Sequence, residues 1–152
     1  MNTIQPEEIT MQLNPYLSFD GQCREAFELY QQLLGGDIAL TQTYAETPMG
    51  DQIPAEARDR IAHTRLIAGN VVLMGSDAFP AAAEGCGRYA KPQGMEVTLG
   101  LDDLNEARRL FDALAEGGSV RMAFEKTFFA EGFGMVTDRF GTPWMVICER
   151  PA

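Results

Sequence analysis

Apolar and polar residues alternate along the chain in a pattern that occurs twice. In the first half, a strand-like stretch at Pro15–Phe19 leads into Cys23–Leu34, where apolar residues recur at the spacing of a helix. Gly35 and Gly36 follow directly, and glycine accepts the left-handed conformation that ends many helices. The sequence therefore predicts a strand and then a helix, whose apolar face consists of Ala26, Leu29, Tyr30, Leu33 and Leu34.

The second half repeats this order. A strand is predicted over Glu96–Leu101, and Asp102 and Asp103 can cap a helix whose apolar face consists of Leu104, Ala107, Leu110, Phe111 and Leu114. Five helix residues match between the halves at one offset of 81 positions: Glu25 with Glu106, Ala26 with Ala107, Leu29 with Leu110, Tyr30 with Phe111 and Leu33 with Leu114. One match can arise by chance, but five at a constant offset indicate a duplicated unit.

Three strand candidates follow each helix. They are Asp37–Tyr44, Ile61–Ala68 and Val71–Ser76 in the first half, and Val120–Thr127, Gly134–Thr137 and Pro143–Cys148 in the second. Glycines at positions 69 and 141 mark tight turns in the last hairpin of each half. We therefore predict a single α+β domain over residues 1–152, with repeats at about 11–77 and 95–150 and a linker at 78–94.

The charge of the chain excludes several classes of partner. Asp and Glu number 22 against 12 Lys and Arg, giving a formal net charge of −10, and no basic run occurs. Nucleic acids and anionic membranes are bound through clustered Lys and Arg, so we expect neither partner. No apolar stretch approaches the roughly 20 residues of a membrane span. The three cysteines have no paired spacing, which indicates free thiols and a cytoplasmic location.

Several motifs resemble those of a known superfamily. They are NPYLSF at 14–19, AHTRLI at 62–67, LMGSD at 73–77, and TFFAEGFG, VTDRFG and TPW within 126–144. Together they resemble the vicinal oxygen chelate superfamily, which includes glyoxalase I, fosfomycin and bleomycin resistance proteins and extradiol dioxygenases, and more narrowly its PhnB-like branch.

The resemblance implies a definite architecture. Two tandem βαβββ modules would form a curved mixed sheet around a small-molecule cleft, with the helices outside and a homodimer across the modules. A tandem ferredoxin-like fold is the alternative. It needs a helix before its last strand, which residues 123–144 do not supply.

Metal-using members of this superfamily place His or Glu ligands at four strand positions. By the resemblance, these positions fall on Pro15, Glu96, Met145, and either Leu73 or Met74. Only Glu96 can bind a hard cation, because proline and aliphatic side chains offer no lone pair and a thioether suits soft metals. We therefore predict no metal at this place and no cofactor.

Strand alternation assigns side chains to the predicted cleft. His63 and Arg65 share one face of their strand, while Leu66 on the other face suits the layer that packs on the helix. His63 is the only histidine; it either moves a proton or binds an anion beside Arg65, or it is a structural residue near a strand end. Glu96 is either a lone general base or a structural partner of Arg65, and we favour the partner role. His63 and Glu96 are thus the catalytic candidates.

The ligand-binding candidates share a predicted position in the cleft or at its rim: Arg65, Met74, Ser76, Thr98, Phe128, Phe129 and Met145. A core role for Met74 and a capping role for Ser76 are the alternatives. Phe128 and Phe129 lie where a strand should end, so they can close the cleft over a flat or apolar ligand.

Two classes of function follow. The first is an enzyme on a small polar or anionic metabolite, with Arg65 as anchor and His63 or Glu96 in proton transfer. The second is a non-catalytic protein that binds and sequesters a small molecule. A methyltransferase is disfavoured, because no glycine-rich strand–helix motif is present to hold a methyl donor. Cys23 lies near a helix start, which can lower the pKa of a thiol, but no nucleophile setting is identified for it.

Overall fold

The computed structural model describes residues 10–79 and 89–149. The first module contains β1 (Tyr16–Phe19), α1 (Cys23–Leu34), β2 (Asp37–Thr43), β3 (Ile61–Ala68) and β4 (Val71–Asp77). The second contains β5 (Val97–Leu101), α2 (Leu104–Ala115), β6 (Ser119–Glu125), β7 (Ala130–Thr137) and β8 (Pro143–Glu149). Three short 3₁₀ turns lie between β2 and β3: η1 (Tyr44–Glu46), η2 (Gly50–Gln52) and η3 (Ala55–Ala57). The predicted α+β class and the duplicated βαβββ unit are confirmed.

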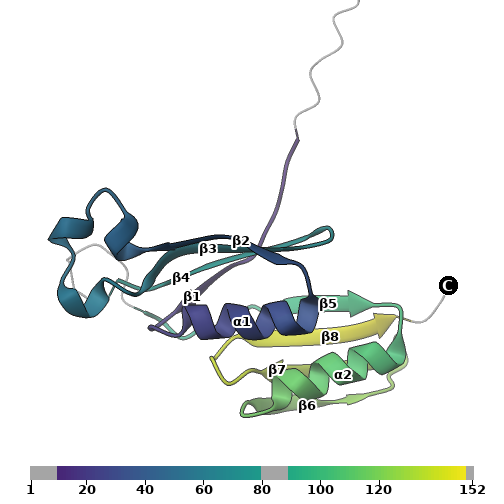
Figure 1. Ribbon diagram of the computed structural model, residues 1–152. Helices are drawn as coiled ribbons and strands as arrows, with labels where there is room; N and C mark the ends of the chain where they lie inside the picture. The colour runs from purple at the N-terminus through teal and green to yellow at the C-terminus, as the bar shows by residue number, and fades with distance from the viewer. Residues whose placement is uncertain (1–9, 80–88, 150–152) are drawn as a thin grey trace, which may run out of the picture.

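The eight strands are divided between two mixed four-stranded sheets (Figure 1). The strand order is β1-β4-β3-β2 in the first sheet and β5-β8-β7-β6 in the second. In each module the strand before the helix pairs in parallel with the last strand, and the other pairs are antiparallel. The two modules therefore have the same topology, as a duplication requires. No helix in the described parts of the chain is long and apolar enough to span a membrane.

Each helix covers one face of its own sheet. The ring of Phe27 on α1 lies over Gly75 of β4, where an added Cβ would come within 2.6 Å of the ring. On α2, Phe111 lies over Gly134 of β7 in the same way, at 2.7 Å. The strand β7 starts at Ala130 and not at the predicted Gly134. Gly132 and Gly134 lie within this strand because the rings of Phe124 and Phe111 occupy the space where a side chain would be. This packing outweighs the preference of glycine for turns.

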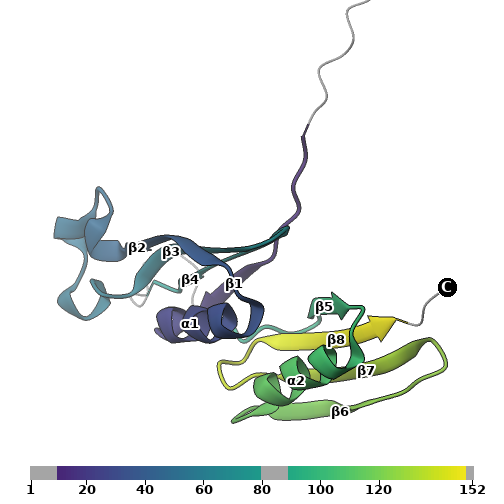
Figure 2. The ribbon, with the colours of Figure 1, turned by 45° about the vertical axis from the view of Figure 1, so that its right-hand side comes forward.

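Helix α1 also joins the two modules. It lies between the first sheet and the second module in both views (Figures 1 and 2). The buried Tyr30 hydroxyl donates to Asp138 Oδ2 at 2.6 Å, and its ring packs edge-on against Trp144 at 5.2 Å. Asp138 and Trp144 belong to the β7–β8 hairpin of the second module, so one continuous core includes residues of both halves.

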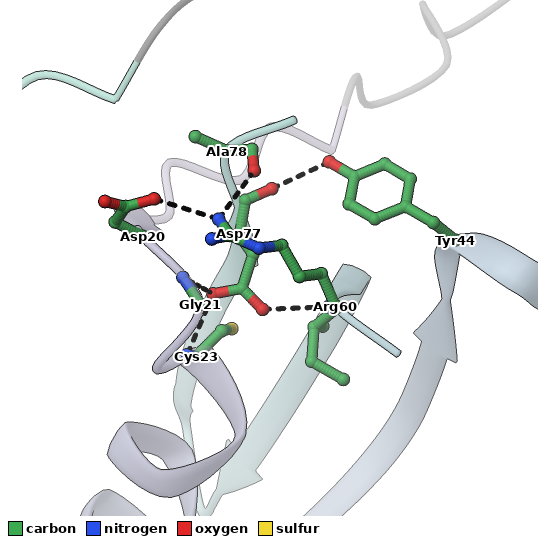
Figure 3. Close-up of polar contacts among 8 residues, drawn as sticks. Asp20, Gly21, Cys23, Tyr44, Arg60, Asp77 and Ala78 are labelled. Carbon is green, nitrogen blue, oxygen red and sulfur yellow. Dashed lines mark hydrogen bonds and ion pairs between the residues drawn. The ribbon is translucent and has the colours of Figure 1, made fainter. Parts of the chain in front are cut away.

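Asp77, at the end of β4, ties three elements of the first module together (Figure 3). Its buried carboxylate accepts from the backbone N–H groups of Gly21 and Cys23 at 2.8 and 3.0 Å, and from that of Ile61 at 2.8 Å. Helix α1 has no capping side chain at its own N-cap. Asp77 therefore caps this helix from a distant strand and fixes where β3 begins.

Candidate functional site

The first sheet has one face that neither α1 nor α2 covers, which we call the first open face. Strand alternation places Leu66, Leu73 and Phe19 against α1, so the residues next to them point to the opposite side. The strand register sets Met74 of β4 between Tyr16 of β1 and Arg65 of β3. The side chains on this face include Tyr16, Ser18, Leu40, Gln42, His63, Arg65, Met74 and Ser76.

His63 and Tyr16 meet on the first open face. The Tyr16 hydroxyl lies 3.1 Å from His63 Nδ1, and the two rings are stacked at 5.7 Å with an interplanar angle of 19°. Because β4 runs between β1 and β3, the tyrosine ring reaches over β4 to make this contact. Sequence reasoning did not single out Tyr16. The inward-facing Leu17 and Phe19 were the available signal, since they leave Tyr16 on the outer side.

Arg65 lies on the same strand face as His63, and its charge is not balanced. Its Nε atom is buried without a hydrogen-bond partner. Among the described residues, no ion pair to Arg65 exists; the three pairs present join Arg60 to Asp20, Arg109 to Glu106 and Arg121 to Glu96. Buried donors are normally satisfied, and those on charged groups especially so.

The second open face, on the side of the second sheet away from α2, carries the other predicted residues. Thr98, Met145, Met135 and Met122 are register neighbours in a row across this sheet. Methionine side chains adapt to irregular surroundings, so the row is a soft apolar strip. Thr98 and Met145 therefore lie side by side, as a shared binding role would require.

Glu96 is paired with Arg121 and not with Arg65, so the predicted partner was wrong. Arg121 Nη1 lies 3.1 Å from Glu96 Oε1. Arg121 belongs to β6 and Glu96 directly precedes β5, so this pair links the two edges of the second sheet above β7 and β8. Sequence patterns missed Arg121 because the contact depends on the register of four strands and not on local spacing.

Phe128 and Phe129 lie in the turn between β6 and β7. Phe128 is 90% exposed and Phe129 45%, and their rings contact one another at 5.1 Å. Phe129 also packs edge-on against Phe133 of the second open face. Phe128 and Phe129 thus pack next to the second open face. Among the described residues, no hydrogen bond, ion pair or ring contact joins them to the His63 and Arg65 group.

The described cysteines are buried free thiols. Burial, reinforced by the charge of Asp77, raises the pKa of the Cys23 thiol far above its ordinary value. The expectation that the helix start lowers this pKa is therefore corrected. Cys23 is the first residue of α1, which covers the side of the sheet opposite His63, so the two cannot form a catalytic pair. Cys86 lies outside the described residues.

One hollow, with a volume of about 300 Å³, lies on the outer side of α1 beside the β7–β8 turn, and it is lined by Glu25, Glu28, Leu29, Gln32, Arg139 and Phe140. None of the predicted site residues lines it. Arg139 there already lies over the Phe140 ring at 5.2 Å. The predicted site residues in the described parts of the chain therefore lie outside this hollow.

Comparison with known proteins identifies the family. Protein YjdN from Escherichia coli K12 is 38% identical over 139 residues, which cover 90% of this chain and 94% of YjdN. The crystal structure of PA1353 from Pseudomonas aeruginosa is 45% identical, with a TM-score of 0.82, and covers 93% of this chain and 100% of that one. The PhnB protein from Bacillus cereus is 19% identical, with a TM-score of 0.71 and coverage of 90% and 98%, a likeness of fold. No family model matches the chain.

The same fold occurs in a glyoxalase-related enzyme from Fulvimarina pelagi and in the fosfomycin resistance protein FosX from Mesorhizobium loti. This chain belongs to the same family as YjdN and PA1353. The fold expected from the resemblance to the vicinal oxygen chelate superfamily and its PhnB-like branch is confirmed.

The residues at the expected ligand positions do not fit a hard metal ion. In the parts of the chain that the structure describes, no three His, Cys, Asp or Glu side chains are grouped as a metal site requires. Tyr16 of β1 lies next to Met74 on the open face, the expected positions on β4 and β8 are methionines, and Glu96 is engaged by Arg121. Hard divalent cations need several oxygen or imidazole ligands at one point, which this set does not offer.

Proposed function

We propose that the first open face binds a small anionic metabolite and that Arg65 is its anchor. The observation that supports this is the buried Arg65 Nε, which has no acceptor, on a side chain with no ion pair to a described residue. A guanidinium remains charged at all physiological pH values, and leaving it unpaired costs free energy. A carboxylate or phosphate offers two acceptor oxygens in one plane, which suits the fork of the guanidinium.

His63 adds acid–base capacity to this site. It lies two residues from Arg65 on the same strand face, roughly 7 Å along the strand. Imidazole titrates near neutral pH and is the usual side chain for proton transfer. We therefore infer an enzyme that holds an anionic substrate through Arg65 and transfers a proton through His63, rather than a protein that only sequesters its ligand.

A homodimer would complete the cleft. In one chain, the first open face is turned away from the second module (Figures 1 and 2). The predicted residues are thus divided between two faces: Arg65 and His63 on one, Glu96, Thr98 and Met145 on the other. A second copy whose second open face covers the first open face would bring the two groups together.

Buried free thiols at Cys23 and Cys148 support the expected reducing, cytoplasmic location.

The anchor role can be tested with simple anions. His63 is the only histidine, so its imidazole NMR signals report this site without assignment ambiguity. We expect inorganic phosphate or malonate to shift these signals in a saturable manner. Arg65→Ala should weaken that binding at least tenfold, which corresponds to about 1.4 kcal/mol. Arg65→Lys should fall between, because an ammonium lacks the planar fork.

Arg24→Ala is the matched control, because Arg24 is exposed on α1 and far from this face. It should bind the anions like the wild type. Equal affinity in Arg65→Ala and the wild type, or no saturable shift with either anion, would refute the anchor. Turnover of a bound metabolite separates an enzyme from a sequestering protein, and stoichiometric binding without turnover would favour the latter.

A further inference from the structure

We propose that Tyr16 is a positioning residue for His63: its hydroxyl donates a hydrogen bond to Nδ1 and keeps the imidazole proton on Nε2. The contact distance of 3.1 Å is that of a hydrogen bond. Stacking of the two rings, at 5.7 Å and 19°, fixes the plane of the imidazole as well. Two contacts from one tyrosine thus set both the orientation and the tautomer of His63.

The direction of the hydrogen bond follows from the chemistry of the two groups. A tyrosine hydroxyl is protonated at neutral pH, with an ordinary pKa of about 10. A neutral imidazole has one donor and one acceptor nitrogen. If Nδ1 accepts from Tyr16, the ring proton must lie on Nε2. No described residue bonds to Nε2, so this N–H remains available to a ligand.

The tautomer decides what His63 can do. An Nε2–H group donates to an acceptor, so the neutral ring can share an anion with Arg65. It can give up a proton as a general acid only after the ring has been protonated to the imidazolium. The opposite tautomer would present a lone pair to the anion, which repels it. This consequence rests on the proposed anion site, whereas the tautomer itself does not.

The test is nitrogen NMR of the full chain labelled with ¹⁵N, at a pH where the imidazole is neutral. The single histidine gives one pair of ring nitrogen signals, which distinguish the two tautomers. We expect the wild type to show Nε2–H alone. Tyr16→Phe keeps the stacked ring but removes the donor, so both tautomers should be populated. Tyr44→Phe is the control, since its hydroxyl donates to the Asp77 carbonyl instead.

Two outcomes would overturn the role of Tyr16: a wild-type Nδ1–H tautomer, or ring nitrogen signals in Tyr16→Phe that match those of the wild type. Phosphate titrations of the same samples test the link to binding. Tyr16→Phe should bind several-fold more weakly than Tyr44→Phe, and unchanged affinity would refute that link. If the tautomer changes as expected but wild-type protein binds neither phosphate nor malonate, the anion site fails and the positioning role stands.

Discussion

At the residue scale, the buried side chains of Asp77 and Asp138 accept hydrogen bonds from backbone N–H groups, and local sequence spacing indicates only some of these bonds. Asp138 Oδ1 accepts from the N–H groups of Phe140 and Thr142, which lie two and four residues further along the chain. The role of Asp77 was missed, because the predicted strand ends at Ser76 and leaves Asp77 in a loop. Its partners Gly21 and Ile61 lie 56 and 16 residues away, so no local spacing indicates them.

Replacing Asp77 should be costly for stability. In Asp77→Asn, one carboxylate oxygen is replaced by an amide –NH₂ donor that faces a backbone N–H, so at least one buried hydrogen bond is lost. We expect the free energy of unfolding to fall by about 2–4 kcal/mol, measured by urea denaturation. Asp20→Asn is the control: Asp20 forms only a surface pair with Arg60, so its loss should cost under about 1 kcal/mol. Equal losses in the two variants would contradict the capping role.

The candidate site shows the limit of sequence reasoning at the same scale. Alternation within one strand correctly places His63 and Arg65 opposite Leu66, because it depends only on neighbouring residues. The Glu96–Arg121 pair and the Tyr16–His63 pair depend on which strands are neighbours and in which register. Such pairings are tertiary, so a chain read on its own gives the face of a side chain but not its partner.

At the element scale, helices and most strands follow from periodicity, whereas their closest contacts do not. The bounds of α1 match the prediction because an apolar face and a glycine pair define them. Gly75 looks like a weak strand residue by propensity. Its purpose is visible only in the packing, where the Phe27 ring occupies the space of the missing side chain.

Gly75→Ala should therefore destabilise the first module. The new Cβ would lie 2.6 Å from the Phe27 ring and 2.9 Å from the Leu17 carbonyl oxygen, so strand or helix must shift. We expect a loss of roughly 1–3 kcal/mol in unfolding free energy. Gly100→Ala in β5 is matched to it: its Cβ would meet nothing closer than 3.9 Å, and stability should stay level or rise slightly. Similar losses in both would show that Phe27 does not require the glycine.

At the scale of the whole molecule, duplication predicts two alike modules but not how they sit together. Tyr30 and Phe111 occupy matching positions in the two helices. Phe111 packs within its own module, over Gly134, whereas Tyr30 reaches Asp138 and Trp144 of the other module. Tyr30 thus connects the two modules, whereas Phe111 does not. With α1 against the second module, the first open face points outward (Figure 1). A repeat in sequence cannot reveal that difference, because both residues are simply aromatic.

This outward orientation leads to a prediction about assembly. Apolar side chains remain accessible on both open faces, including Leu40 at 46% and Met122 at 49% exposure, and a second copy would cover them. We expect the wild type to sediment as a dimer at micromolar concentration. Met122→Glu would place a charge in the covered strip and raise the dimer dissociation constant at least tenfold.

Gln32→Glu adds the same charge on the exposed side of α1 and should leave the dimer unchanged. Arg65 and His63 would face the partner, so dissociation and loss of anion binding should occur together in Met122→Glu. A wild-type monomer that binds phosphate with full affinity would show that one chain suffices for the site. A dimer unaffected by Met122→Glu would place the contact between copies on another surface.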